Sequence, residues 1–334
     1  MRQVRTPGSA AALVAVLLLA NYMQLPAATA DEGTAAEVPA EDSSGESRHI
    51  LQVGGHGTPQ QPVDVDRIVR VLQKGTSSRE AREQALARLP LSQLSEADRA
   101  KASAVLEDAS LFREMPSISI PVDHTVFRYF SHRPDVAVSI WRAMEISKLD
   151  MKQVGASDYV ADAGDGTSGD IHFVWRSENS ALVLCDGVYS NALLLRPIRA
   201  QCLLHIESSL SKRKSGEPYA AHRAALFVAF PSQSVGTVAR IVSPVSNRLL
   251  DRNVREISAF LHLMSTAMEN QPGFIERLAE RMEGLPEGRQ EEFLRVAARA
   301  YVDRQRREAT AAGEPASLPE LPLTTADQST APLR

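Results

Sequence analysis

The 334-residue chain is poor in cysteine, in aromatic side chains and in long apolar runs, and each shortage excludes a class of protein. It has two cysteines, so a disulfide-dense scaffold is excluded. Aromatic residues make up 5% and hydrophobic residues 43% of the chain, an ordinary balance for a globular protein. The formal net charge of -4 argues against a dedicated nucleic-acid-binding protein, which usually carries a basic domain. After residue 30 no apolar run reaches the roughly 20 residues that a membrane-spanning helix needs.

Residues 1–30 have the pattern of a secretory signal peptide. Arg2 and Arg5 precede a short apolar segment, residues 10–19, and the small residues 28–30 fit a cleavage site before Asp31. No cysteine follows the apolar segment, so a lipid-modified N-terminus is not indicated. We therefore expect an exported protein, periplasmic or extracellular, with no transmembrane span after cleavage. An uncleaved anchor is the alternative.

The two cysteines lie in neighbouring apolar segments, Cys185 in residues 181–186 and Cys202 in residues 198–207. If these segments pair as an antiparallel hairpin centred near residues 193–194, the cysteines face each other at a separation that suits a disulfide. The oxidising environment of an exported protein would permit that bond. Two buried free thiols are the alternative.

The chain after the leader divides into five parts. Residues 31–62 are rich in Glu, Ser and Gly and poor in apolar residues, as in a disordered linker, and residues 311–334 form a similar tail. Between them, residues 63–114 predict a helical module, residues 115–270 an α+β domain, and residues 271–310 two further helices.

The helical module is expected to contain three helices. The first ends at Gly75, the second begins at Ser77, which forms a capping-box pattern with Glu80, and the third begins at Ser95. The module carries many charges and no reactive constellation, which indicates a packing or interaction role.

The α+β domain begins with strand-like alternation over residues 117–122, which residues 125–130 extend or repeat, and continues with a helix over residues 135–145. Strand segments at short spacing then predict an antiparallel meander over residues 149–154, 159–162, 171–176, 181–186, 198–207 and 219–230. A long amphipathic helix over residues 234–268 follows, which Pro244 either kinks or restarts. The predicted fold class is α+β: a curved antiparallel sheet packed on a long C-terminal helix, with a helical N-terminal module and extra C-terminal helices.

The alternation also predicts which side chains share a face of the sheet. It places Phe173 and Trp175 on one face of residues 171–176, and Arg176 on the other. In residues 219–230 both faces are largely apolar, so both sides of the sheet are expected to be covered. The long helix covers one side, and the N-terminal helices, or a curved sheet around a cavity, cover the other. A fully packed core is the alternative to a cavity.

Residues 164–169 match the letters G-x-G-x-x-G, but their context argues against a dinucleotide loop. Such a loop needs a helix after it, whereas a strand is predicted here. A hairpin turn is the favoured interpretation. A calcium site using Asp162, Asp165 and Asp170 is the weaker alternative, because their spacing does not fit the EF-hand loop.

Histidines and serines give no catalytic or metal signature. His172, His205 and His222 lie in different predicted strands without the spacing of a zinc motif, so structural roles are favoured. No G-x-S-x-G elbow is present, and neither cysteine lies in a reactive context. No catalytic residue, metal or cofactor is therefore predicted. The arginines near the end of the last helix indicate a solvated helix end or, alternatively, a polyanion-binding patch: Arg299, Arg304, Arg306 and Arg307.

The order of helix, strand run and long C-terminal helix over about residues 117–268 resembles the START-like, helix-grip superfamily of hydrophobic-ligand-binding proteins. The resemblance implies that a curved sheet wraps the long helix and leaves a cavity for a lipid or other apolar ligand. No binding residue follows from a motif. The leader, the helical module and the last helices are not part of the superfamily pattern.

The leading hypothesis is therefore an exported, non-catalytic protein that binds a lipid-like or apolar small molecule between the sheet and the long helix. Large or polar side chains on the predicted strands are the candidates for the lining or mouth of the cavity: Trp175, Tyr189, His205 and Arg223. The alternative is a structural or interaction component of the bacterial cell envelope, which docks on a protein partner and has no ligand. An enzyme ranks third, because the constellations that would support one are missing.

Overall fold

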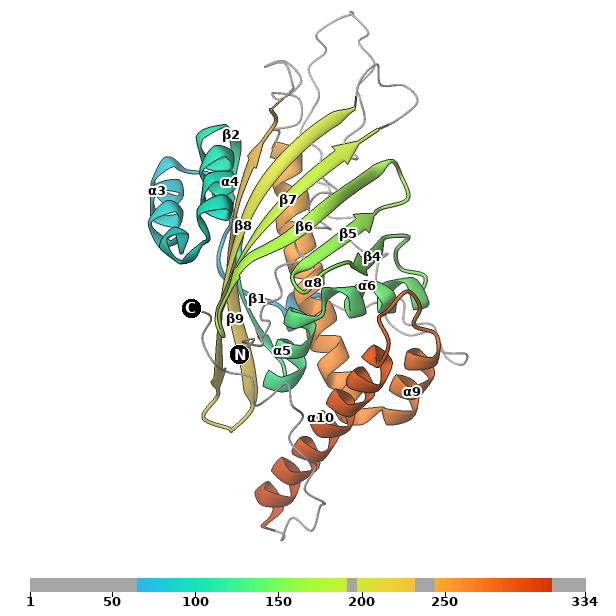
Figure 1. Ribbon diagram of the computed structural model, residues 1–334. Coiled ribbons are helices and arrows are strands. Elements are labelled where there is room, and N and C mark those ends of the chain that lie inside the picture. The colour runs from blue at the N-terminus through green and yellow to red at the C-terminus, as the bar shows by residue number, and fades with distance from the viewer. Residues whose placement is uncertain (1–64, 191–196, 232–243, 314–334) are drawn as a thin grey trace, which may run out of the picture.

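The computed structural model describes residues 65–190, 197–231 and 244–313. The predicted leader and linker lie outside these residues, as does nearly all of the predicted tail. The described chain is an α+β structure in which a curved, open antiparallel sheet of nine strands is packed on a long helix (Figure 1). The predicted fold class is thus confirmed.

The sheet contains every predicted strand of the meander, joined in sequence order. Its neighbouring strands, from one edge to the other, are β1 (Arg70–Gln73), β3 (Ser117–Pro121), β9 (Pro218–Ala229), β8 (Ile198–Lys212), β7 (Ser180–Tyr189), β6 (Thr167–Arg176), β5 (Asp158–Asp162) and β4 (Asp150–Gln153). A further strand, β2 (Ala109–Glu114), pairs with the end of β9 beyond β3. Because β6 to β9 are long and adjacent, they form the centre of the sheet.

The inner face of the sheet, defined here as the face that packs on the long helix, carries the main core. The helices on this side are α5 (His124–His132), α6 (Pro134–Ala143) and α8 (Pro244–Asn270). Apolar residues of α8 recur every three or four positions and are buried: Leu250, Val254, Ile257, Leu261, Met264 and Met268. They pack with inward-facing residues such as Leu204 and Leu226 in one continuous cluster. Burying each such side chain contributes roughly 1.5–3 kcal/mol.

The outer face of the sheet is covered by α3 (Arg79–Arg88) and α4 (Glu96–Glu107), with the short 3-10 helix η1 (Leu91–Gln93) between them (Figure 1). Leu182, Leu203 and Phe227 point to this side and pack with Ala102 and Val105 of α4. The prediction that both faces of the sheet are covered is confirmed.

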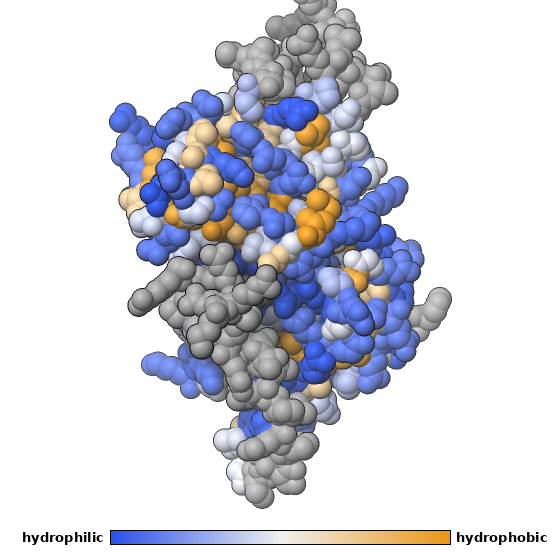
Figure 2. Space-filling model, viewed as in Figure 1, coloured by the Kyte–Doolittle hydropathy of each residue, from blue (hydrophilic) through white to orange (hydrophobic). Residues whose placement is uncertain are grey.

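Two helices complete the described chain, α9 (Pro272–Glu280) and α10 (Arg289–Ala312). As predicted, both follow the long helix, and α10 packs along α8 and α5 (Figure 1). The surface over α9 is mostly hydrophilic in Figure 2, whereas apolar side chains show through near α3 and α4.

The helical module differs from its prediction at both ends. The expected first helix is a single turn, α2 (Val65–Ile68), followed by β1, because Val71 pairs with Ile118 across the sheet. The module also supplies β2, so it contributes two strands to the sheet. The second helix begins one residue later than predicted, with Ser78 as its N-cap, and Ser95 caps the third as predicted.

Residues 125–130 are helical rather than an extension of the preceding strand. Asp123 caps α5, since its Oδ1 accepts hydrogen bonds from the backbone N–H groups of Thr125 and Val126. The cap and the burial of Val126, Phe127 and Phe130 against the core outweigh the β propensity of these residues.

A β-bulge in β6 corrects the predicted facing of its last residues. The register shifts between Phe173 and Trp175, so that Trp175 pairs with Leu182 and Arg176 with Ala181. One extra residue in a strand exchanges the faces of all that follow. Trp175 therefore lies on the outer face with Val174, and Arg176 points to the inner face beside Phe173.

The two cysteines face each other, as the predicted hairpin requires. Cys185 and Cys202 are direct partners in the β7–β8 pair, and both side chains are buried on the inner face. Both are free thiols in the structure. A hydrogen bond from the Cys185 thiol to Cys202 and burial raise the pKa of Cys185, which favours its neutral form.

The glycine-rich segment is a hairpin turn between β5 and β6, as predicted. Gly166 has a φ of 96°, and a Cβ there would lie 2.0 Å from the carbonyl oxygen of Ser190. Asp162 and Asp165 accept hydrogen bonds from the backbone N–H groups of Gly164 and Thr167. Their carboxylates thus stabilise the turn.

Candidate functional site

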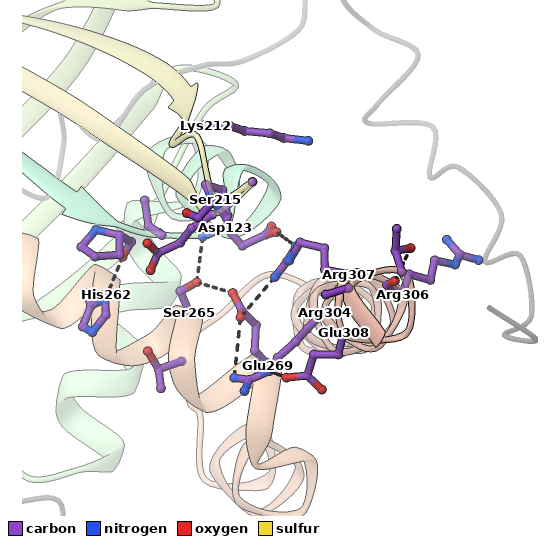
Figure 3. Close-up of a pocket in the computed structure, with 18 residues that line it drawn as sticks. Asp123, Lys212, Ser215, His262, Ser265, Glu269, Arg304, Arg306, Arg307 and Glu308 are labelled. Atoms are coloured by element: carbon purple, nitrogen blue, oxygen red, sulfur yellow. Dashed lines mark hydrogen bonds and ion pairs between the residues drawn. The ribbon is translucent and has the colours of Figure 1, made fainter. Parts of the chain in front are cut away.

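A groove of about 940 Å³ lies at one end of the sheet, where four segments distant in sequence meet (Figure 3). Its walls are the β8–β9 hairpin, the junction of β3 with α5, the second half of α8 and the last turns of α10. We call it the end groove. Its volume is within the range of small-molecule sites.

The α8 wall of the end groove is a polar strip on an amphipathic helix. His262, Ser265, Thr266 and Glu269 line the groove at positions i, i+3, i+4 and i+7. This spacing places the four side chains on one face of the helix. The adjacent face carries Leu261, Met264 and Met268 into the core, which fixes the rotation of α8.

The α10 wall supplies three arginines, of which two reach α8. Arg307 bridges Asp123 and Glu269, with N–O distances of 3.4 and 3.3 Å. Arg304 pairs with Glu308 at 2.7 Å and lies 4.0 Å from Glu269. The dashed lines in Figure 3 follow these pairs from α10 to α8 and to the start of α5. The ion pairs therefore hold α10 against the rest of the groove.

Asp123 and Ser265 connect the floor of the groove. The backbone N–H of Asp123 donates to Ser265 Oγ at 2.9 Å, and Ser265 Oγ donates to Glu269 Oε1 at 3.0 Å. Burial raises the pKa of the Glu269 carboxyl, and the positive charge of Arg307 opposes that rise. Asp123, Ser265 and Glu269 are thus joined by hydrogen bonds, and together they give the groove a fixed polar floor.

The hairpin wall carries a different kind of cation. Lys212 is exposed at the end of β8, and among the described residues it has no ion-pair partner (Figure 3). Nearby, His262 Nδ1 donates to the carbonyl oxygen of Pro121 at 2.7 Å. That bond fixes the orientation of the imidazole ring at the wall of the groove.

The lining of the end groove balances four basic side chains against four acidic ones: Lys212, Arg304, Arg306 and Arg307 against Asp123, Glu217, Glu269 and Glu308. Most of these charges are in ion pairs, so the groove is close to neutral. Its surface offers apolar contact, hydrogen bonds and one exposed ammonium group. Such a surface can bind and orient a small molecule.

The four residues predicted from the sequence do not line the end groove, and the structure divides them between the two faces of the sheet. Tyr189 packs against the inner core. Trp175 packs against the apolar cluster of the outer face. His205 lies on the same face, because it pairs with Leu182 of that cluster. Arg223 does so too, because it pairs with Glu207, two residues after His205 in β8. Three of the four are thus neighbours, but under α3 and α4 rather than around α8.

These outer-face residues belong to a charged cluster that holds α3 on the sheet. Arg88, in the last turn of α3, donates to Glu114 at 2.8 Å and to Glu207 at 3.0 Å. Arg223 donates to both oxygens of Glu207, at 2.8 and 2.9 Å. We call these four residues, Arg88, Glu114, Glu207 and Arg223, the outer clasp. Burial acts to raise the pKa of Glu207, but the hydrogen bonds and positive charges of the two arginines of the clasp outweigh it and lower that pKa. At Glu114 burial is the stronger influence, and it raises the pKa.

The three strand histidines each have a separate partner. His205 Nε2 lies 2.9 Å from Ser180 Oγ, His222 Nε2 lies 2.9 Å from Ser258 Oγ of α8, and His172 pairs with Asp158. Burial lowers the pKa of His205 and of His222 to about 4. In the described part of the chain, no three His, Cys, Asp or Glu side chains are grouped so that they could hold a metal ion.

Sequence reasoning identified the arginines of the groove but not the groove. Arg304, Arg306 and Arg307 stood out as a cationic helix end, while the carboxylates that Arg304 and Arg307 reach across the groove lie on α8 and before α5. A local signal was present in α8, where His262 and Glu269 interrupt one face of the apolar stripe. Lys212 and Asp123 had no local signal, because folding alone brings them together.

No protein-family model matches the chain, and no curated protein matches its sequence. Within the described ranges, none of the helices combines the length and the apolar character needed to cross a membrane.

Proposed function

We propose that the protein is an exported, non-catalytic binding protein that holds a small amphipathic molecule with an acidic head group in the end groove. The observation that carries this proposal is Lys212, an exposed cation at the rim of a groove whose other charges are largely paired. An anionic head group would pair with it and accept hydrogen bonds from the groove wall.

The apolar part of such a ligand has surfaces to contact. Pro121, Val122 and Pro218 line the groove at the end of the sheet, and Ala311 lines it on α10. The interface between the inner face and α8, where the superfamily resemblance implies a cavity, is filled by a continuous apolar cluster. The end groove is therefore the better place for a ligand that touches both sheet and long helix.

Export is part of the proposal and is supported by the pattern of residues 1–30. A role as an interaction component of the cell envelope is the competing function. The outer helices and the hydrophilic surface over α9 would then be docking surfaces (Figure 2).

The test is a titration of the purified full-length protein with a fluorescent fatty acid, which joins a carboxylate to an apolar chain. We expect saturable binding. Lys212→Met should weaken it about five- to tenfold, because an exposed charge-assisted hydrogen bond is worth about 1 kcal/mol. Thr266→Trp, which fills the groove from an exposed position on α8, should abolish binding.

Lys101→Met is the matched control, because Lys101 is equally exposed but lies on α4, away from the groove. It should bind like the unmodified protein. Absence of fatty-acid binding, or equal binding by the Thr266→Trp variant, would overturn the proposal. A stoichiometric protein partner recovered from envelope fractions, with no fatty-acid binding, would favour the interaction role.

A further inference from the structure

A second polar cluster lies inside the molecule, where the first turns of α6 and α10 meet. Arg289 lies 3.4 Å from Asp135 and donates to Gln153 at 2.8 Å. Arg133 pairs with Glu292 at 3.2 Å, and Arg289 lies 3.4 Å from the same carboxylate. None of these residues lines the end groove.

Arg176 is the unusual member of this cluster. The bulge in β6 turns its side chain to the inner face, where it is 7% exposed and its guanidinium carbon lies 3.2 Å from the centre of the Phe173 ring. None of its three nitrogens has a hydrogen-bond partner among the described residues. The hydroxyl of Tyr159, a residue 1% exposed, lies close enough to Arg176 to favour its charged form, but it makes no hydrogen bond of good geometry to Arg176 or to any other described residue. Buried donors of this kind call for an acceptor, often an ion or a water molecule.

The charges of the cluster do not balance. Arg133, Arg176 and Arg289 contribute three positive charges, and Asp135 and Glu292 two negative ones. Burial lowers the pKa of Arg176 to about 10, which leaves it cationic at neutral pH, and burial raises the pKa of Asp135. The cluster thus carries a formal excess of one positive charge, and an uncompensated buried charge is strongly unfavourable.

The N-terminus of α10 adds to this positive potential. α10 begins after Gly288, which has no side chain to cap the first turn of the helix. The free N–H groups of a helix start attract negative charge. α10 is long enough for this effect, with 24 residues, whereas α6 begins with Pro134, which has no N–H group.

We infer that Arg176, Arg133 and the Tyr159 hydroxyl bind a small monovalent anion of the chloride class at the meeting of α6 and α10. One negative charge neutralises the excess, and a halide loses its hydration more readily than a phosphate or sulfate. Arg133 and Glu292, whose side chains are 20% and 23% exposed, give the site its connection to solvent. The anion would link β5 and β6 to both helix starts and so stabilise the docking of α10.

The test is thermal unfolding of the full-length protein in chloride and in gluconate at equal ionic strength. If the dissociation constant is about tenfold below the chloride concentration, chloride should raise Tm by about 3 to 6 °C. Arg176→Met, which keeps the volume and removes the charge, should abolish the difference. Arg128→Met is the control, since Arg128 belongs to the exposed surface pair with Glu178, and it should keep the full chloride effect.

Equal Tm values in the two salts, or an undiminished chloride effect in Arg176→Met, would overturn the inference. Crystals grown in bromide provide a second measurement that needs no variant. An anomalous peak within hydrogen-bond distance of Arg176 supports the site, and its absence contradicts it. This measurement decides the question even if the Arg176→Met variant fails to fold.

Discussion

The two faces of the central sheet are held to their helices by different forces. On the inner face, one continuous apolar cluster joins the strands to α5, α6 and α8. On the outer face, a much smaller apolar cluster lies under α3 and α4, and the charged residues of the outer clasp border it. Hydrophobic burial therefore positions the long helix, whereas the outer helices depend on a few contacts, ion pairs and caps as well.

A single strand shows the contrast. In β8, Leu204 and Ile206 point into the inner core, while His205 and Glu207 between and after them face the outer helices. Because side chains alternate along a strand, one segment serves both interfaces. The inner set is purely apolar, and the outer set mixes apolar, titratable and charged groups.

The largest loss of stability is expected from a variant that leaves a cavity in the inner core. Phe260 of α8 packs against Phe130 and Trp141, with ring centroids 5.6 and 5.4 Å apart. Phe260→Ala should lower the free energy of unfolding by about 3–5 kcal/mol. Phe112→Ala, on the outer face, should cost about 2–3 kcal/mol, because the small outer cluster can relax around the missing ring. Urea unfolding measures both.

Phe260→Leu serves as the control, since it keeps most of the volume and should cost far less than the alanine variant. Equal losses for Phe260→Ala and Phe112→Ala would show that the two faces contribute alike, against the comparison drawn above.

Alternation of side chains made the strands from β4 to β9 predictable, because each is held by its sequence neighbours. The edge strand β1 was not predictable in this way. Val65, Ile68, Val69 and Leu72 have helical spacing, and only pairing with the distant β3 makes residues 70–73 a strand. The facing of Trp175 failed for a similar reason, since the bulge beside it depends on β7. Non-local pairing overrides local pattern in both places.

The end groove was beyond prediction for a geometric reason. Its walls come from four separate segments, and ion pairs such as that of Arg307 with Asp123 join residues 184 positions apart. A sequence shows that α10 ends in arginines and that α8 has a polar face. It does not show that these two surfaces meet.

The next largest effect is acid destabilisation through one histidine on each face. His222 lies on the inner face beside Ser258, and His205 on the outer face beside Ser180. Burial lowers the pKa of each to about 4, while an unfolded histidine titrates near 6.5. The unfolded chain therefore binds more protons between these values, so stability falls as the pH drops from about 6.5 to about 4. Each histidine should contribute about 2–3 kcal/mol to this loss.

His222→Gln and His205→Gln should each reduce the loss, which unfolding in urea at pH 7, 5.5 and 4.5 would measure. The raised pKa values of Asp135 and Glu269 act in the opposite direction, because the folded protein takes up those protons more readily. A variant with the pH dependence of the unmodified protein would show that its histidine titrates normally in the fold.

A smaller loss of stability is expected when one ion pair of the outer clasp is removed. Arg88→Met leaves Glu114 without its cation, while Glu207 keeps Arg223. We expect a loss of about 1–2 kcal/mol at low salt, because Glu114 is partly buried. The loss should shrink in 1 M NaCl, which screens the pairs of the unmodified protein. Arg79→Met is the control, since its pair with Glu83 is exposed and should contribute little. A salt-independent loss for Arg88→Met would mean that the stem of Arg88, rather than its charge, holds α3.

The smallest effect tests whether α4 needs its cap. Ser95 Oγ accepts a hydrogen bond from the backbone N–H of Asp98 at 3.1 Å, and Ser95→Ala removes that acceptor. The loss should be about 1 kcal/mol, whereas Ser110→Ala, in an exposed part of β2, should cost less than about 0.5 kcal/mol. Amide hydrogen exchange would locate the change, with faster exchange in α4 and unchanged protection in α8. If α8 loses protection as well, the outer helices stabilise the inner core through the sheet, and the two faces behave as one cooperative unit.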